Sequence, residues 1–368
     1  MIRISRTLLV ILFLCGMLLL PAIGSAQSNV QTQEHLMQIA RIALSVQLDN
    51  LTATSHADSL DVDPSVYGVA IQDQVVDARG KRAFLMQRGF WYSGYTTNLQ
   101  FAKMEDEDSG SVTIHAIEHT ALQIATDIND PLAPKTYEYE LPHNFLFALQ
   151  KNQWVLVSDE TAPFGFATDT DGSSRKETMP ADNNVADSVL PGVVNINRSA
   201  VVNYAYQYWQ NYNTSVYPRS FGGYGQGGDC TNFVSQAMRA GGWSPTGGWD
   251  WRSPSEWWYG ALTQTYTWVN VNNFYSFMRY TNRGNTVLTF VANFSPVGSF
   301  FNPLATGDLL QFDATPTNGS YDHNMIITSK DSRGYIYLTY HTTNTRDRPI
   351  WDLIYATPNY SYRGIRIY

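Results

Sequence analysis

The sequence predicts an α+β protein made of two successive domains, each with helices before antiparallel strands. Apolar residues recur at helical spacing over 30–50, and β-rich runs bounded by Gly, Asp, Asn or Pro follow up to residue 160. The order of helices before strands is repeated over 196–368. The stretch 161–195 between them is polar and contains few large apolar residues, so we expect a linker there.

Residues 1–26 have the pattern of a secretory signal peptide. Arg3 and Arg6 precede an apolar run, and small residues at 24–26 form a cleavage site. The apolar run is shorter than the ~20 residues that a membrane-spanning helix needs. We therefore expect a secreted protein, extracellular or associated with the cell wall, with no stable membrane insertion after cleavage. Cys15 leaves with the signal, so Cys230 becomes the single thiol of the mature chain.

The composition argues against nucleic-acid binding. The net charge is −8 and charged residues make up 15% of the chain, whereas nucleic-acid binders present a basic stripe. The 23 Tyr, 17 Phe and 10 Trp suit sugar or peptide grooves, although most such rings serve as core residues. We expect a monomer that acts on a peptide or peptidoglycan-like substrate without a cofactor.

The first domain is predicted to span 27–160, with one helix over 30–50. The expected strands that follow are 66–78, 82–95, 111–126, 136–150 and 152–160. This arrangement resembles cystatin-like or nuclear-transport-factor-like accessory domains. His115 and His119 share one face of a strand, and with no cysteine or third histidine nearby we interpret them as a surface pair.

The second domain places Cys230 at the start of a helix. A first helix is predicted near 195–213, and a glycine-rich loop then leads to Asp229, a good N-cap residue. Helical periodicity continues for about ten residues and stops at Gly241 and Gly242. The partial positive charge at a helix start favours the thiolate, which is the nucleophilic form of cysteine.

Two histidines of the second domain are candidates for the base that a cysteine nucleophile needs. The expected strands are 307–314, 323–329, 335–342 and a last run at 363–368. His323 begins the second of these strands and His341 ends the third. If Ser329 pairs with Tyr335 across a turn at 330–334, the two histidines face each other with Cβ atoms ~5 Å apart. A register different by one residue would place them on opposite faces.

Several strings of the second domain resemble the putative amidase domain family, which belongs to the papain-like cysteine hydrolases together with cell-wall peptidases of the NlpC type. The strings are 228-GDCTNFVSQAMRAGG-242, 251-WRSPSEWW-258, 307-GDLLQFD-313, 322-DHNMIITS-329 and 338-LTYHTTNTRDRPI-350. The resemblance extends from about residue 203 to the end. It implies a papain-like, NlpC-like domain with N-terminal helices and a C-terminal antiparallel sheet.

The resemblance also implies roles for individual residues. Cys230 matches the nucleophile, His323 the general base and His341 the third, orienting residue, with Asn344 as a second candidate for the third position. A thiolate at Cys230 would attack an amide carbonyl and form a thioester acyl-enzyme. The Cys230 N–H is a candidate oxyanion donor, and further candidate donors or supporting residues are Gln226, Tyr224 and Asp229.

Two other function classes stay open on the sequence. One is a catalytically inactive papain-like binding module that uses an aromatic ligand surface formed by Trp243, Trp249, Trp251, Trp257 and Trp258. The last four of these tryptophans are also candidate substrate-binding residues of the enzyme. The other class is a transglutaminase-like acyl transferase, which differs in the acyl acceptor. We expect no metal, because no closely spaced pair of ligands nucleates a zinc site.

Overall fold

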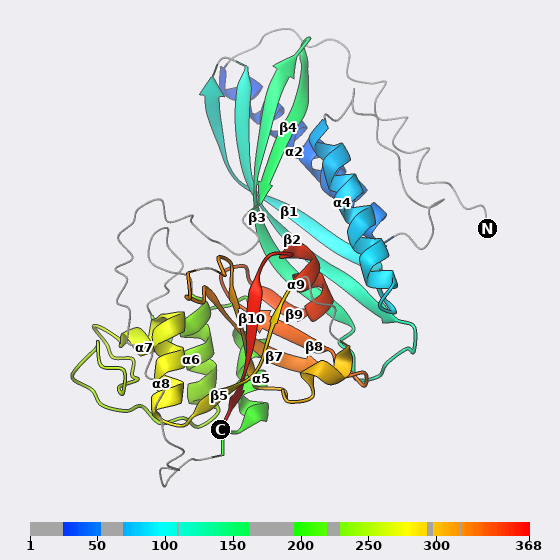
Figure 1. Cartoon of the computed structure of the whole chain (residues 1–368). Helices are drawn as coiled ribbons and strands as arrows, with labels where there is room; N and C mark the ends of the chain where they lie inside the picture. Colours follow the sequence, from blue (N-terminus) through cyan, green and yellow to red (C-terminus); the bar gives the residue numbers. More distant parts are fainter. Residues whose placement is uncertain are drawn as a thin grey trace.

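The computed structural model describes residues 25–52, 69–108, 110–161, 195–218, 229–292, 297–316 and 318–368. The described chain is a mixed α+β structure with one large antiparallel sheet and helices on its faces (Figure 1). Within these residues, no helix combines the length and apolarity needed to cross a membrane. The predicted signal peptide and linker lie almost entirely outside the described residues.

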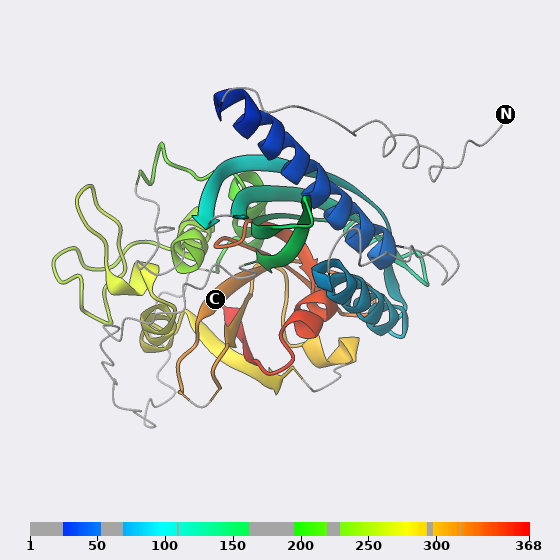
Figure 2. The same cartoon turned by 90° about the horizontal axis from the view of Figure 1, so that it is seen from above.

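The first segment packs two helices against four strands. The helices are α2 (Ser25–Thr52) and α4 (Val69–Met86), and the strands are β1 (Phe90–Asp108), β2 (Ser111–Thr126), β3 (Thr136–Gln150) and β4 (Gln153–Thr161). The predicted helix over 30–50 and the three predicted strands after residue 110 are confirmed. Figure 2 shows α2 crossing over the curved strands of this segment.

The prediction of strands at 66–78 and 82–95 is wrong over most of its length, because α4 occupies 69–86. Its buried residues Ile71, Val75, Ala78 and Leu85 recur at spacings of four, three and seven, which place them on one face of a helix. A run rich in β-branched residues therefore forms a helix, since tertiary packing outweighs the strand propensity of isolated valines and isoleucines. Strand structure begins at Phe90.

The second segment contains helices that precede and flank six strands. The helices are α5 (Arg198–Tyr208), α6 (Cys230–Ala240), α7 (Tyr266–Val269), α8 (Val271–Tyr280), the 3-10 helix η2 (Gly298–Phe301) and α9 (Ile350–Ala356). The strands are β5 (Gly284–Val291), β6 (Leu309–Asp313), β7 (His323–Lys330), β8 (Ile336–Tyr340), β9 (Thr345–Pro349) and β10 (Ser361–Ile367). The four strands predicted for this segment are confirmed as β6, β7, β8 and β10, whereas β5, β9 and α9 were not expected.

The two segments share one sheet instead of forming two separate ones. Its order is β1-β2-β3-β9-β8-β7-β6-β10-β5, and β4 also pairs with β3. The junction is the antiparallel pairing of Glu138 with Arg346 and of Tyr139 with Thr345. The described strands of both predicted domains are therefore hydrogen-bonded to each other through β3 and β9.

Two hydrophobic cores lie on the two faces of the second segment's strands. One core includes Met325 and Ile327 of β7 and continues into the residues that α2 and α4 bury. The other includes Ile326 and packs against Phe233 of α6 and Phe274 of α8. Because side chains alternate along a strand, each residue of β7 faces one core or the other. On the side of the first core, α9 lies beside α4 in both views (Figures 1 and 2).

Candidate active site around Cys230

Cys230 is the first residue of α6, as the sequence predicted, and Gly241 and Gly242 end that helix. Asp229 precedes the helix, but its carboxylate makes no side-chain cap bond to the helix backbone. It accepts instead from Asn232 Nδ2 at 2.8 Å and lies 2.5 Å from Nδ1 of His341. The residue before the candidate nucleophile therefore binds the histidine that directly follows β8.

The Cys230 thiol is buried, with 3% of the residue exposed. Its Sγ lies 3.7 Å from Thr231 Oγ1 and accepts from the backbone N–H of Asn324 at the start of β7. Burial raises the pKa of the Cys230 thiol, and these hydrogen bonds only partly oppose that effect. In this arrangement the protonated thiol is favoured, so a nucleophilic role requires a base.

The His341 ring is held on both of its nitrogens. Nδ1 lies 2.5 Å from the Asp229 carboxylate and Nε2 lies 2.7 Å from the backbone carbonyl of Tyr208, the last residue of α5. The ring is packed between Phe233 and Tyr212, at centroid distances of 4.0 and 4.2 Å. The Tyr208 carbonyl can only accept, so Nε2 carries a hydrogen and donates to it, while Nδ1 is bound by the Asp229 carboxyl. The ring is therefore fixed between Asp229 and Tyr208.

The His323 ring lies on the other face of the sheet. It stacks on Phe312 at 5.1 Å and meets the Tyr340 ring edge-on at 5.1 Å. The next residue, Asn324, points toward α6 and donates to Thr231 Oγ1 at 2.8 Å. Burial, and to a smaller extent the charges of Arg348 and His341, lowers the pKa of His323 to about 3. The ring is therefore neutral at physiological pH.

The predicted register between the two histidine strands is wrong by one residue. Ile326 pairs with Thr339, so the register continued to the strand ends places His323 opposite residue 342 instead of His341. At the turn, Ser329 pairs with Tyr337 instead of Tyr335, a difference of two residues, and the irregularity between Ile327 and Ser329 then reduces the difference to one. The structure thus brings His341 to Asp229, and the expected orienting contact between His341 and His323 is replaced by that pair.

Asn344, the second candidate for the third position, lies where the two segments meet. Its Nδ2 donates to Glu140 Oε2 at 2.7 Å, and its Oδ1 accepts from the Tyr212 hydroxyl at 3.2 Å. Glu140 belongs to β3 of the first segment. No local pattern in the sequence indicates this contact, because it joins residues 204 positions apart.

The tryptophans that were candidate ligand contacts have different surroundings. Trp257 is fully buried and donates to Ser235 Oγ at 3.1 Å, so it is a core residue and not part of an exposed ligand surface. Trp243 is also buried in that core. Trp258 is half-buried and donates to the Glu256 carboxylate. The Trp251 ring packs edge-on against Tyr266, and Trp249 is 95% exposed. Tyr224 and Gln226 lie outside the described residues.

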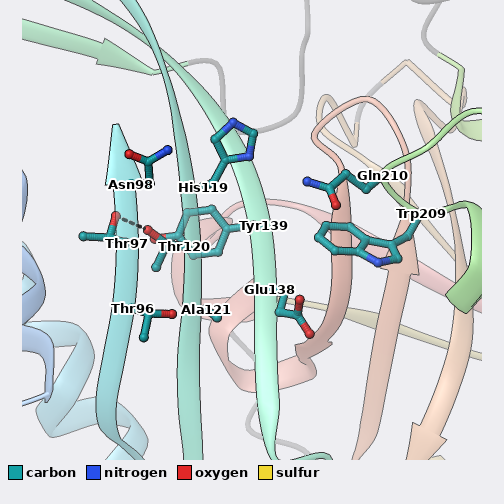
Figure 3. A pocket seen from close by; sticks show the side chains of 10 residues that line it. All are labelled: Thr96, Thr97, Asn98, His119, Thr120, Ala121, Glu138, Tyr139, Trp209 and Gln210. Carbon is teal, nitrogen blue, oxygen red and sulfur yellow. Dashed lines mark hydrogen bonds between the residues drawn. The ribbon is translucent and has the colours of Figure 1, made fainter. Parts of the chain in front are cut away.

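A pocket of about 260 Å³ lies between the first segment and the residues that follow α5 (Figure 3). Its lining is Thr96, Thr97, Asn98, His119, Thr120, Ala121, Glu138, Tyr139, Trp209 and Gln210. Trp209 follows Tyr208, whose carbonyl binds His341, so the pocket wall and the His341 site share one stretch of chain. In the described ranges, no group of three or more His, Cys, Asp or Glu side chains is placed to hold a metal ion.

Comparison with known proteins supports the resemblance for the second segment. Residues 195–365 match the family model described as a putative amidase domain, which supports amide hydrolysis as the activity of this segment. One similar solved structure is the Kfla4162 protein from Kribbella flavida, with 12% identity over 35% of this chain and 90% of that chain. Its TM-score is 0.25, so this likeness carries no argument. A search of curated proteins gives no match.

Proposed function

We propose that this protein is an exported cysteine hydrolase that cleaves amide bonds of peptides or peptidoglycan through a thioester on Cys230. The observation that carries the proposal is the position of Cys230 as the first residue of α6, inside the segment that matches the putative amidase domain. The helix start and the N–H of Asn324 both favour negative charge on Sγ.

The reaction needs a proton acceptor for the thiol, and His323 is the proposed base. A neutral imidazole can accept a proton, and His323 directly precedes Asn324, whose amide meets Sγ. His341 is a poorer choice, because its two nitrogens already face Asp229 and Tyr208. Because the His323 ring lies on the face of β7 opposite to Cys230, the proposal requires the backbone at the start of β7 to change conformation and bring the ring to the thiol, where a less buried ring would regain basicity.

The proposed chemistry proceeds in two steps. The thiolate adds to the amide carbonyl, the C–N bond breaks, and the amine leaves with the proton taken from the thiol. Water then attacks the thioester, which releases a carboxylic acid and restores the thiol. His341 contributes by holding Asp229, the residue that directly precedes the nucleophile, and so fixes the start of α6.

The test is hydrolysis by the purified protein and by the Cys230→Ala variant. Peptide mixtures and purified peptidoglycan are incubated with each, and mass spectrometry detects new amine and carboxyl ends. We expect products with the wild type and a loss of at least 1,000-fold without the thiol, since covalent catalysis has no substitute nucleophile there. Retained hydrolysis in Cys230→Ala would refute the cysteine mechanism.

An alkylation experiment separates the enzyme from the binding module. Iodoacetamide is added over a pH series, and labelling of the Cys230 peptide is measured by mass spectrometry. An activated thiol reacts near neutral pH, whereas a thiol that reacts only above pH 9 indicates an inert cysteine. Absence of both labelling and hydrolysis would favour the binding module.

A further inference from the structure

Glu140 of the first segment binds two separate stretches of the second segment. Its Oε2 accepts from Asn344 Nδ2 at 2.7 Å, and its Oε1 accepts from the side-chain amide of Gln210. Its backbone N–H also donates to the carbonyl of Asn344 at 2.9 Å. On the side of the first segment, His119 Nδ1 lies 2.8 Å from the same carboxylate. One carboxylate therefore connects β2 and β3 to the chain after α5 and the chain after β8.

The two stretches that Glu140 binds are those that enclose His341. The stretch 208–212 supplies the Tyr208 carbonyl, which accepts from His341, and the Tyr212 ring, which packs on it at 4.2 Å. The stretch 341–344 begins with His341 itself and ends with Asn344, whose side chain accepts from the Tyr212 hydroxyl. The Glu140 carboxylate therefore binds both stretches of chain that surround His341.

The chain of contacts continues to the candidate nucleophile. His341 binds the carboxylate of Asp229 at 2.5 Å, and Asp229 is bonded directly to Cys230 in the chain. The charge of Asp229 acts on the thiol and raises its pKa, so the position of His341 beside Asp229 influences the thiol. Other charged or titratable groups near this site are His323, Arg348, Tyr204, Tyr208 and Tyr212.

We propose that Glu140 is a positioning residue for the Cys230 site, so that the first segment takes part in the reaction instead of only folding beside the second. This inference rests on the proposed function and deepens it. Glu140 acts by holding 208–212 against 341–344, which keeps His341 on Asp229. Without the carboxylate, Gln210 and Asn344 lose their common acceptor and His341 moves away from Asp229.

Glu138 provides a matched control on the same strand. It lies two residues from Glu140 on the same face of β3, and it also reaches the second segment, through Arg346 Nη1 at 3.3 Å. It is 30% exposed, against 17% for Glu140. Figure 3 shows that Glu138 and Gln210 come from the two sides of the pocket. Loss of Glu138 removes one link between the segments without removing an acceptor of Gln210 or Asn344.

The test measures the pH dependence of Cys230 alkylation in Glu140→Ala, Glu140→Gln and Glu138→Ala. For Glu140→Ala we expect the midpoint of the rate profile to rise by about one pH unit, because Asp229 is less well neutralised beside the thiol. Glu140→Gln keeps one carbonyl acceptor and should shift by less, and Glu138→Ala should stay within about 0.2 units. Equal shifts in Glu140→Ala and Glu138→Ala would overturn the proposal.

Asn344→Ala and the double variant Glu140→Ala/Asn344→Ala complete the test. If Glu140 acts through Asn344, the shifts of the single variants do not add in the double variant; additive shifts would contradict the proposal. Variants are compared after their circular dichroism spectra and unfolding midpoints match the wild type, and Glu140→Gln replaces Glu140→Ala if the latter does not fold. Alkylation needs no substrate. If the wild type hydrolyses nothing, the proposed hydrolase activity is refuted, but the pH dependence of Cys230 alkylation can still be measured in all variants.

Discussion

The carboxylate of Asp229 lies in the protein interior, where it contacts the His341 ring. An aspartate before a helix ordinarily caps the helix backbone, but here the carboxylate binds His341 and Asn232. Asp229 and His341 are 1% and 2% exposed, so the pair is removed from water. A buried ion pair adds little net stability, but removal of one member leaves the other charge in a medium that solvates it poorly.

This environment predicts a large effect of His341→Leu on folding. We expect a loss of about 3 kcal/mol or more in the free energy of unfolding, because the buried carboxyl of Asp229 would lose the partner that binds it at 2.5 Å. Urea denaturation at pH 7 measures the loss. The double variant Asp229→Asn/His341→Leu should recover part of it, and the exposed His35→Leu should change stability by less than about 0.5 kcal/mol. A His341→Leu protein as stable as the wild type would show that the contact with Asp229 does not stabilise the fold.

Among the helices and strands, those that depend on the pattern of neighbouring residues can be predicted from the sequence. The start of α6 at Cys230 follows from the glycine run and from the apolar spacing after it, and β2 and β3 follow from alternating patterns. The sequence does not predict the helix α4, because its three valines and one isoleucine favour strands locally and its burial against the sheet is a tertiary effect. The register of β7 and β8 depends on the pairing at the turn, where Ser329 meets Tyr337, and on one irregularity beyond it, and no periodicity reveals either.

Strand β3 also holds a buried charge cluster that gives a pH prediction. His143 Nε2 lies 2.9 Å from Glu118 and Nδ1 lies 2.8 Å from Asp159, all nearly fully buried. Burial alone would lower the pKa of His143, but the two carboxylates outweigh it and raise the pKa to about 9. Since the folded state holds this proton more tightly than the unfolded state, the stabilisation is complete below pH 6.5 and is lost as pH rises through about 9.

We therefore expect the free energy of unfolding to fall between pH 6.5 and 9.5 by up to about 3 kcal/mol from this cluster. Urea denaturation at several pH values in this range measures the slope of the free energy of unfolding against pH. In His143→Gln the slope should be much flatter, and His119→Gln on the neighbouring strand, where the histidine is 31% exposed, should keep the slope of the wild type. An equal slope in the wild type and His143→Gln would contradict the assignment.

For the whole molecule, the main departure from the sequence-based expectation is that the two predicted domains are joined. The sequence indicates a polar linker and two separate runs of helices and strands, and each run taken alone suggests its own sheet. The pairing of β3 with β9 joins residues 208 positions apart, and neither strand carries a local sign of its partner. Residues of α2 and α4 share one core with residues of β7 and β8. This shared core predicts that the described parts unfold together.

The network around Asp352 allows this prediction to be tested. Asp352 of α9 is fully buried and binds Lys81 of α4 at 2.5 Å, the Tyr92 hydroxyl of β1 at 2.8 Å and Arg348 at 2.8 Å. Burial opposes its ionisation, but the charges of Lys81 and Arg348 outweigh this effect and lower the pKa of Asp352. The ionised carboxylate thus holds cations from both segments inside the shared core.

Asp352→Asn should destabilise both segments together, by about 3 kcal/mol, because two cations lose their buried counter-charge. Hydrogen exchange measured by mass spectrometry should show equal loss of protection in peptides from β2 and from β7, and calorimetry should show a single transition. The difference in the free energy of unfolding between the variant and the wild type should become smaller below about pH 4, where the Asp352 carboxyl becomes protonated in the unfolded wild-type chain.

Asp127→Asn is the control. This variant also loses a link between the segments, to Arg333 at 3.0 Å, but the Asp127 side chain is 55% exposed, so we expect a loss of less than about 1 kcal/mol in the free energy of unfolding. Loss of protection confined to the second segment would mean that the first segment folds by itself, and the shared core would then be only a contact surface between two independent domains.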